Sequence, residues 1–376
     1  MTSAPPREPL GFYPTPLHPL PRLSAHLGGP RLLVKRDDLT GFALGGNKVR
    51  KLEFFLGEAR TAGADVLLTT GGHQSNHARI TAAAATRAGL DCILVLSGGE
   101  PAAETGNLVL DRLFGARVRF VPTRAERGPM LEALAGELRA AGRRPHVIPL
   151  GGSTPLGALG YVEAVRELVA QLGLAVADTG PLTIVHGSSS GGTQAGLVVG
   201  VRATGLAARV IGVSADETRA DLTAMIAAIA GPLAERLDLP PPPAAAVEVL
   251  DEYVGEGYGI PTAASTEATA LFARLEGIPL DPTYSAKAAA GLIDLVRRGA
   301  FARDESVCFW HTGGMVWTVA RAGGGDPAAR PRSHVADAGI VSPVLGNEDQ
   351  QGGGHGAEVG HAVAVAEHLT TAPFRA

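Results

Sequence analysis

The chain has 376 residues and a formal net charge of -4, and 45 % of its residues are hydrophobic. That length and apolar content suffice for two domains or for one large α/β unit with an extensive core. The mild negative charge gives no reason to expect nucleic acid or an anionic membrane as a partner. No run approaches the roughly 18 to 20 apolar residues that a membrane span needs, and residues 1–9 lack the apolar core of a secretion signal. We therefore expect a cytoplasmic protein.

Short apolar segments alternate with alanine-rich stretches of helical length. These segments lack the polar alternation of half-buried strands, which is typical of parallel sheets covered by helices on both faces. The predicted strands span 65–69, 92–96, 118–121, 146–149, 182–186 and 209–214. The predicted helices span 75–88, 104–113, 130–141 and 156–172, and one more begins near Thr193. The pattern predicts an α/β fold with parallel sheets flanked by helices.

The two cysteines and the end of the chain add little chemistry. Cys92 and Cys308 each lie in an apolar run of strand character, so we expect buried free thiols and neither a disulfide nor a metal site. Residues 324–376 are rich in Gly, Pro, His and acidic side chains and are expected to be extended or disordered. The histidines of this tail are irregularly spaced, and we expect no metal there: His334, His355, His361 and His368.

Lys48 follows two glycines and an asparagine and opens an amphipathic helix. Glycines allow other groups to approach the backbone closely. The positive end of a helix dipole lowers the pKa of a lysine placed there and so favours the free amine. A free amine is what a Schiff base with an aldehyde cofactor requires. Taken alone, the pattern also fits a solvated lysine after a tight turn.

A turn of small residues, His186 to Thr193, follows a predicted strand and opens a helix. Its backbone amides, together with the hydroxyls of Ser190 and Thr193, can bind a phosphate at the helix N-terminus. It matches neither the Walker pattern nor the Gly-x-Gly-x-x-Gly fingerprint of dinucleotide sites. One compact phosphomonoester therefore fits better than a nucleotide pyrophosphate, although a flexible loop has the same composition.

The segment Gln74-Ser75-Asn76-His77 lies at another strand-to-helix junction, after a double glycine. Ser75 is expected to cap the helix. The same segment also supplies amides and side-chain donors for a carboxylate. A lysine flanked by glycines, a single-phosphate site and a carboxylate site together point to pyridoxal phosphate acting on an amino acid.

The chain resembles the 1-aminocyclopropane-1-carboxylate deaminase and D-cysteine desulfhydrase family over roughly residues 10 to 320. Several motifs that occur together in the right order identify a family far more specifically than any one motif alone. The motifs are Lys35-Arg36-Asp37-Asp38-Leu39, Gly45-Gly46-Asn47-Lys48, Gln74-Ser75-Asn76-His77, Gly192-Thr193-Gln194-Ala195-Gly196, Gly257-Tyr258-Gly259, Leu280-Asp281-Pro282-Thr283-Tyr284 and His311-Thr312-Gly313-Gly314.

The resemblance implies the tryptophan synthase β-like fold, known as fold type II, with the cofactor between two α/β domains. The large domain would comprise residues 1–51 and 156–323, and the small domain residues 52–155. A homodimer is expected from the family alone.

The resemblance also implies how the cofactor is held. Lys48 would bind it covalently and later move protons at Cα. Asn76 would bond the ring hydroxyl. The phosphate would lie on Ser190, Gly191, Gly192 and Thr193.

The substrate residues are implied in the same way. Ser75, Asn76 and His77 would bind the amino acid, with Ser75 and His77 on its carboxylate. Tyr258 and Tyr284 would face the substrate, one of them handling the leaving group. We count Lys48, Ser75 and the two tyrosines as the catalytic set.

Ser285 divides the family. The ring-opening deaminases have a glutamate at this position, which contacts the pyridine nitrogen and makes the ring a strong electron sink. A neutral hydroxyl, from Ser285 or Thr312, leaves the ring less electron-withdrawing. Opening a cyclopropane demands more carbanion stabilisation than expelling a β-substituent. The position therefore favours β-elimination.

The favoured hypothesis is a lyase that acts on D-cysteine. The Lys48 amine removes the Cα proton, the β-substituent leaves, and hydrolysis yields pyruvate and ammonia; with D-cysteine, sulfide is released. A 1-aminocyclopropane-1-carboxylate deaminase, an L-cysteate sulfo-lyase and a biosynthetic β-replacement enzyme remain alternatives. A degenerate amino-acid sensor is the non-enzymatic one.

Two departures from the family pattern bear on the substrate. His73 stands where a small apolar residue is expected, and it is predicted to border the site. Trp317 adds bulk after the last double glycine.

Overall fold

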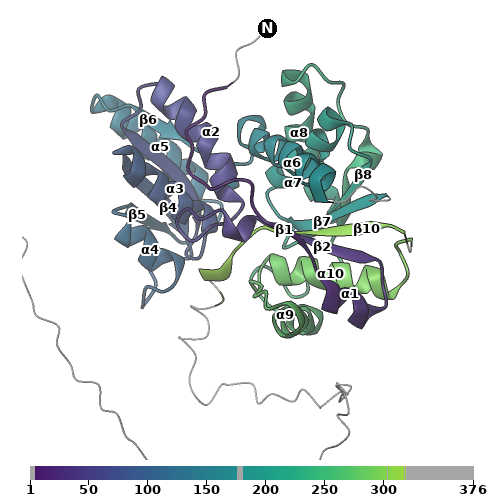
Figure 1. The fold of residues 1–376 in the computed structure, drawn as a ribbon. Helices are drawn as coiled ribbons and strands as arrows, with labels where there is room; N and C mark the ends of the chain where they lie inside the picture. The colour runs from purple at the N-terminus through teal and green to yellow at the C-terminus, as the bar shows by residue number, and fades with distance from the viewer. Residues whose placement is uncertain (1–4, 176–180, 303, 317, 319–376) are drawn as a thin grey trace, which may run out of the picture. The chain divides into compact units, whose positions relative to one another are not determined.

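The computed structural model describes residues 5–175, 181–302, 304–316 and 318, and its strands form two sheets (Figure 1). The larger sheet has the order β1-β2-β10-β7-β8-β9, and the smaller has the order β5-β4-β3-β6. Only β1 is antiparallel to its neighbour among these described strands. The fold is therefore α/β with predominantly parallel sheets, as the sequence predicted.

The strands of the larger sheet are β1 (Leu17–Pro19), β2 (Arg31–Arg36), β7 (Leu182–Ser188), β8 (Ala208–Ser214), β9 (Glu248–Leu250) and β10 (Ser306–His311). The strands of the smaller sheet are β3 (Val66–Gly72), β4 (Asp91–Ser97), β5 (Arg117–Val121) and β6 (Pro145–Val147). The helices are α1 (Pro21–Leu27), α2 (Lys48–Thr61), α3 (Asn76–Ala88), α4 (Asn107–Leu113), α5 (Arg127–Ala140), α6 (Pro155–Ala175), α7 (Gly192–Thr204), α8 (Arg219–Arg236), α9 (Ala263–Glu276) and α10 (Ser285–Arg297). Short 3-10 helices are η1 (Asp37–Leu39), η2 (Leu150–Gly152) and η3 (Ala244–Ala246).

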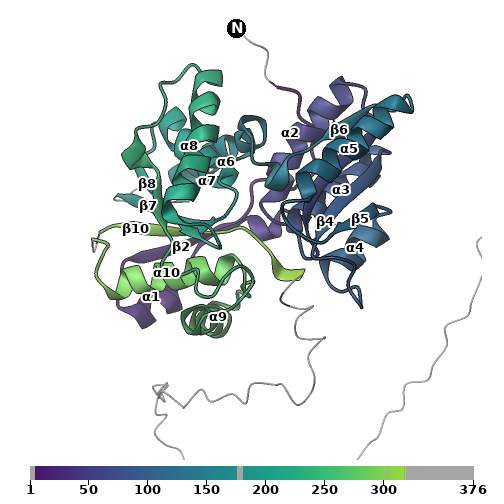
Figure 2. The ribbon, with the colours of Figure 1, turned by 180° about the vertical axis from the view of Figure 1, so that it is seen from behind.

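Helices cover both faces of the larger sheet because its strands are apolar on both sides. On β2, Leu32 and Val34 pack towards α1, α9 and α10, whereas Leu33 packs towards α6 and α7. Figure 1 and Figure 2 show α6, α7 and α8 on one side of the sheet and α1, α9 and α10 on the other. Continuous apolar runs of this kind are expected where both faces are buried.

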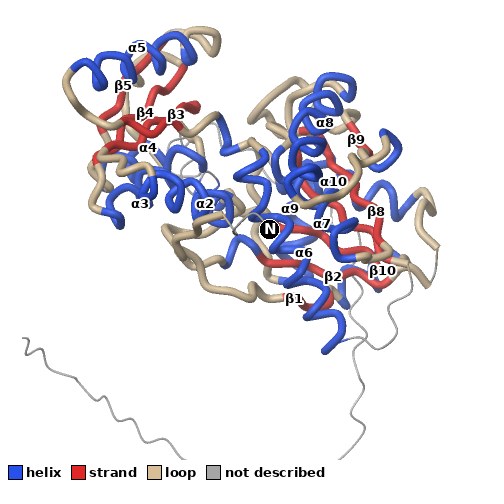
Figure 3. The backbone as a smooth tube through the Cα atoms, turned by 90° about the horizontal axis from the view of Figure 1, so that it is seen from above, coloured by secondary structure: helices blue, strands red, loops and turns tan. Residues whose placement is uncertain are grey.

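The smaller sheet is enclosed in the same way. Val66 and Leu68 of β3 contact α5, and Leu67 between them contacts the opposite core, which α2 and α3 complete. In Figure 3, α5 lies on one side of β3, β4 and β5, and α2 and α3 lie on the other. Two separate cores therefore hold the smaller sheet in place.

The predicted elements from 65 to 214 are all present, with ends that differ by a few residues. The two cysteines are buried and free, as expected. β3 to β6 fall inside the expected small domain of residues 52–155, but α2 begins before it at Lys48 and packs on α6 as well as on α3. The domain boundaries stay a prediction, and the expected tail of 324–376 lies outside the described residues.

No helix in the part of the chain that the structure describes is long and apolar enough to cross a membrane.

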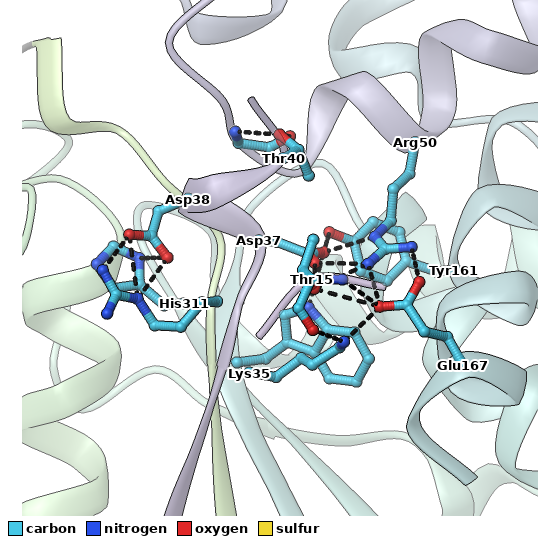
Figure 4. A network of polar contacts seen from close by, with 12 residues as sticks. Thr15, Lys35, Asp37, Asp38, Thr40, Arg50, Tyr161, Glu167 and His311 are labelled. Atoms are coloured by element: carbon cyan, nitrogen blue, oxygen red, sulfur yellow. Dashed lines mark hydrogen bonds and ion pairs between the residues drawn. The ribbon is translucent and has the colours of Figure 1, made fainter. Parts of the chain in front are cut away.

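A buried ionic network joins β2, η1, α2 and α6 (Figure 4). The guanidinium of Arg50 donates to both oxygens of Asp37, at 2.8 and 2.9 Å, and to Glu167 at 2.9 and 3.0 Å. Lys35 donates to Glu167, and the ring of Tyr13 lies 4.4 Å from the guanidinium carbon. The network ties segments that are distant in sequence to the start of α2.

Asp37 is the centre of this network because its carboxylate accepts from four side chains. Besides Arg50, the donors are Thr15, Tyr161 and Trp310, at 2.7 to 2.9 Å. Burial by itself raises the pKa of Asp37, but the charge and hydrogen bonds of Arg50 outweigh it and hold the pKa below its usual value. Asp37 is therefore ionised, and its charge is fully paired.

Removing one member of this buried pair is expected to destabilise the protein strongly. Asp37→Asn leaves the buried cations Lys35 and Arg50 to share the single carboxylate of Glu167, and breaking a buried pair costs about 3 to 5 kcal/mol. Glu267→Gln, which breaks the exposed pair with Arg297, is the control and should cost no more than about 1 kcal/mol. Urea unfolding followed by tryptophan fluorescence measures both. Equal losses in the two variants would contradict the expectation.

Candidate active site

A cavity lies at the carboxyl ends of strands from both sheets. The turns after β3, β7, β8 and β10 all contribute to its wall, which is where open parallel sheets bind ligands. Its lining includes many predicted residues: Lys48, Ser75, Asn76, His77, Ser190, Gly191, Thr193, Tyr258, Tyr284 and Thr312. Two predicted residues, Gly192 and Ser285, do not line it. The structure thus brings together side chains that are far apart in the sequence, such as those of Lys48 and Thr312.

Lys48 is the first residue of α2, as predicted, and its Nζ donates to the carbonyl of Gly151 at 3.2 Å. The turn before it requires glycine. Gly45 and Gly46 have φ of +69° and +113°, and a Cβ on Gly46 would lie 3.2 Å from the carbonyl oxygen of Thr312. That carbonyl also accepts the backbone N–H of Asn47 at 2.9 Å. The turn therefore directs the lysine into the cavity.

Burial lowers the pKa of Lys48 to about 8. The sequence predicted a lowered pKa but attributed it to the helix dipole, whereas desolvation is the cause resolved here. Roughly a tenth of the amine is therefore unprotonated at pH 7. The unprotonated amine is the form that can act as a nucleophile or base.

Lys51 is a second buried lysine in this region, and the sequence reading missed it. It follows Lys48 by one helical turn, so both side chains lie on the same face of α2. Its Nζ donates to Gly151 and Ser153, each at 3.3 Å, and burial followed by the charge of Lys48 lowers its pKa well below the usual value. The three-residue spacing of the two lysines was the available signal.

The small-residue turn after β7 adjoins Lys51. Ser153 and Ser190 share a hydrogen bond of 2.7 Å, and a Cβ on Gly192 would lie 2.9 Å from the Lys51 amine. The backbone N–H of Gly192 donates to the carbonyl of Ser190 at 3.0 Å. Gly192 therefore allows the close approach of Lys51, and its direct contact with the phosphate stays a prediction.

Ser75 caps α3 as predicted, since its Oγ accepts the backbone N–H of Ala78 at 3.1 Å. The amides of Asn76 and His77 are the first two of the helix and have no acceptor within it. They can donate to an anion next to the Ser75 hydroxyl.

His77 lies in a different setting from the expected one. The hydroxyl of Thr69 donates to the carbonyl of Ile148 at 2.7 Å, so it accepts from Nε2 of His77 at 2.8 Å. Burial, and then the charges of Lys48 and Lys51, lower the His77 pKa well below normal. The neutral ring keeps only Nδ1, a lone-pair acceptor in this tautomer, which cannot donate to a carboxylate.

Tyr258 and Tyr284 lie together on the cavity wall. Their hydroxyls are hydrogen-bonded, and their rings meet edge to face at 5.7 Å. Burial is the main cause that raises the pKa of both, that of Tyr284 well above its usual value. Both phenols are therefore protonated at neutral pH and can donate a proton.

Thr312 and Ser285 were the two candidates for a neutral hydroxyl near the cofactor ring. Ser285 Oγ donates to the carboxylate of Asp281 at 2.6 Å and accepts its backbone N–H at 2.7 Å, at the start of α10. This local bonding explains why it faces away from the cavity. The hydroxyl of Thr312 lines the cavity and makes no hydrogen bond to a residue that the structure describes.

Two further predictions concerned neighbouring bulk. His73 does not border the cavity: its Nε2 bonds the carbonyl of Gly99 at 2.7 Å, and its ring packs edge-on against Phe120. Trp317 lies outside the described residues.

Arg124 and Arg127 also line the cavity and were not predicted. Arg124 lies 5.1 Å from the centre of the Tyr258 ring and 3.5 Å from Asp216. Arg127 is half-buried and has no acidic partner within 4 Å among the described residues. Arg124 lies in the segment that joins β5 to α5, and Arg127 is the first residue of α5. The composition of this stretch carries no site signal.

This donor set fits pyridoxal phosphate. Lys48 offers an amine for the aldehyde, and Lys51 places a second amine, which can donate hydrogen bonds, beside the turn that would hold the phosphate. Ser188 lines the same cavity, and its buried hydroxyl has no partner among the described residues. Gly151 has φ of +68°, and a Cβ there would come within 2.4 Å of Ser190 Oγ and 3.3 Å of the Lys48 amine. The space beside the lysine is therefore kept clear.

The chain belongs to the family of pyridoxal-phosphate dependent enzymes, whose model matches residues 9–313. It is 43 % identical over 314 residues to a D-cysteine desulfhydrase of Klebsiella pneumoniae (strain 342), a match that covers 82 % of this chain and 94 % of that protein. A D-cysteine desulfhydrase of Salmonella typhi is 42 % identical with the same coverage. A crystal structure of an ACC deaminase homologue matches with a TM-score of 0.77 and 38 % identity, covering 83 % of this chain and 93 % of that one. The protein is thus a pyridoxal-phosphate dependent lyase of fold type II.

The lowered pKa of Lys48 predicts how the cofactor attaches. Only the unprotonated amine attacks an aldehyde, so attachment to the cofactor-free enzyme should accelerate with pH and level off above about 8. An ordinary lysine would gain speed up to its usual pKa of 10.5. Stopped-flow absorbance from about pH 6 to about pH 10 measures this rate, with Lys48→Ala as the control that should show no attachment. Continued acceleration above pH 9 would contradict burial as the controlling factor.

Proposed function

We propose that this enzyme eliminates the β-substituent of a small amino acid and that its substrate is D-cysteine. The reaction consumes D-cysteine and water and releases pyruvate, ammonia and sulfide. The observation that carries the proposal is the amine of Lys48, with a pKa of about 8, on the wall of one cavity with Tyr258 and Tyr284. The D-cysteine desulfhydrases named above support the choice of substrate.

The residues of the chain divide the work. Pyridoxal phosphate, when bound, withdraws electrons from the substrate Cα. Lys48 holds it and then takes the Cα proton as the base. Asn76 binds the ring hydroxyl, and Ser190, Gly191, Gly192 and Thr193 bind the phosphate, with the Lys51 amine as a further hydrogen-bond donor.

The substrate is oriented by the opposite set of contacts. Ser75, with the amides of Asn76 and His77, binds the carboxylate, and His77 supports this segment through its bond to Thr69. The hydroxyls of Tyr258 and Tyr284 face the leaving group on Cβ. Because both phenols are protonated at neutral pH and one donates to the other, the remaining O–H donates to the group that departs from Cβ.

Thr312 is the residue that favours β-elimination over ring opening. Its neutral hydroxyl lines the cavity, and a neutral partner at the pyridine nitrogen leaves the ring a weaker electron sink than a carboxylate does. A thiol or thiolate at Cβ leaves more readily than a cyclopropane bond breaks. Of the two neutral hydroxyls that the sequence offered for the pyridine nitrogen, Thr312 therefore takes this role in place of Ser285.

The proposal extends to a cytoplasmic homodimer with neither nucleic acid nor membrane as partner. Its support is the family resemblance and the net charge of -4.

The purified enzyme is expected to form pyruvate and sulfide from D-cysteine. Lys48→Ala should lose the absorbance band of the lysine-bound cofactor and reduce turnover by roughly 10² to 10⁴, the contribution typical of a positioned base. L-Cysteine and 1-aminocyclopropane-1-carboxylate are the comparison substrates in the same assay. Formation of 2-oxobutyrate from the latter, at a rate above that of pyruvate from D-cysteine, would overturn the proposal.

Cysteate elimination is the second candidate, and Arg127 is the observation that favours it. A half-buried guanidinium without an acidic partner can bind an anionic β-substituent such as a sulfonate. If it does, Arg127→Gln should lower kcat/KM for L-cysteate by about tenfold or more and leave kcat/KM for D-cysteine within about twofold. Coupled sulfite and sulfide assays compare the two substrates. Equal effects on both would remove Arg127 from substrate selection.

A further inference from the structure

Asn76 is the predicted contact to the cofactor ring, and its amide must be turned the right way to make it. An amide presents either an oxygen acceptor or an NH₂ donor to the cavity, and these two orientations have nearly the same shape. Only the donor orientation can bond the ring oxygen in its deprotonated form, which accepts and cannot donate. Something in the protein therefore has to fix the direction of this side chain.

Asn107 provides the contact that fixes it. Asn107 is the first residue of α4 and is fully buried, and its Nδ2 donates to Oδ1 of Asn76 at 3.0 Å. The same Nδ2 donates to the backbone carbonyl of Gln74 at 2.8 Å. The Nδ2 group of Asn76 makes no hydrogen bond to any residue in the described ranges and is left for the cavity.

The direction of Asn107 is in turn determined by Arg79. Arg79 follows Asn76 by one turn of α3 and donates to Oδ1 of Asn107 at 3.2 Å. A guanidinium can only donate and a carbonyl can only accept. Asn107 lies between the two, so its oxygen must face Arg79 and its NH₂ must face Gln74 and Asn76. The chain of contacts admits a single arrangement of both amides.

Arg79 is itself anchored to the loop of Lys48. Its other terminal nitrogen donates to the carbonyl of Gly45 at 2.8 Å, three residues before the lysine. Arg79 is fully buried, so neither contact competes with solvent. One guanidinium thereby sets the lysine loop and the direction of the Asn76 amide relative to each other.

We propose that Asn107 is a positioning residue that, held by Arg79, turns the NH₂ of Asn76 towards the cofactor ring oxygen. It touches neither cofactor nor substrate and does not line the cavity. The proposal rests on the cofactor and not on D-cysteine. A different substrate would leave it standing.

Asn107→Asp tests the proposal because aspartate has nearly the same shape but only accepts. In its ionised form, which the charge of Arg79 favours, the carboxylate accepts from Asn76 Nδ2, so the oxygen of Asn76 turns towards the ring oxygen. Affinity for pyridoxal phosphate should fall by roughly ten- to a hundredfold. The pH titration of the absorbance band of the bound cofactor should shift as well, because its ring oxygen loses a donor. Equilibrium dialysis and absorbance spectra measure the two effects.

Comparing the loss of cofactor affinity in Asn107→Ala with that in Asn107→Asp distinguishes a positioning role from a merely structural one. Alanine leaves Asn76 free to rotate, so the loss of affinity should be smaller than that of Asn107→Asp. A merely structural role predicts the reverse, because alanine removes more contacts and leaves Arg79 without its acceptor. Thr105→Ala, which removes an exposed hydrogen bond to Gln74, is the matched control and should leave affinity and spectrum unchanged.

The double variant completes the test. In an Asn76→Ala background, Asn107→Asp should lower cofactor affinity no further, because its effect passes through Asn76. Thermal unfolding of each variant with saturating cofactor reports whether the fold is retained. Additive losses in the double variant, or wild-type affinity and spectrum in Asn107→Asp, would overturn the proposal.

Discussion

The ion pair between Asp37 and Arg50 is the interaction on which the rest of the site depends. A buried pair needs every remaining polar atom satisfied, and the Asp37 carboxylate meets that condition with four side-chain donors. The backbone carbonyl of Asp37 meanwhile accepts the N–H of Gly46 at 2.9 Å. Arg50 lies two residues after Lys48 on the same helix. The pair therefore fixes both the turn before the catalytic lysine and the helix that carries it.

The turn of Lys48 is held from two other directions as well. Thr312 accepts the N–H of Asn47, and Arg79 donates to the carbonyl of Gly45. These contacts come from the end of β10, which belongs to the larger sheet, and from α3, which packs on the smaller sheet. A loop held by η1, β10 and α3 together has little freedom to change the direction of its lysine. The double glycine is required because these groups approach the backbone too closely for a side chain.

The sequence predicted the parts of the structure that depend on local pattern. The parallel strands follow from their apolar runs, the start of α3 from Ser75, and the start of α2 from the glycines before Lys48. The direction of single side chains was harder to predict. His73 and Ser285 belong to the right motifs, but hydrogen bonds to Gly99 and Asp281 turn them away from the cavity.

Contacts between distant segments could not be predicted at all from one sequence. Asn107 meets Asn76 across 31 residues, and Glu167 meets Lys35 across 132. Lys35 and Asp37 were recognised as part of a motif, but their burial in a paired network depends on α6, which lies far along the chain. The sequence shows which residues can carry a charge, but it does not show which of them form ion pairs in the protein interior.

Burial is the common cause of the proton-transfer properties of the site. Loss of solvent disfavours the charged form of any group, so it lowers the pKa of Lys48 and raises those of Tyr258 and Tyr284. One environment thus brings the pKa of the amine close to neutral pH while both phenols stay protonated at the same pH. An elimination needs a base at Cα and a proton donor near Cβ, and both are set by enclosing these residues in one cavity. No separate charged partner has to tune either group.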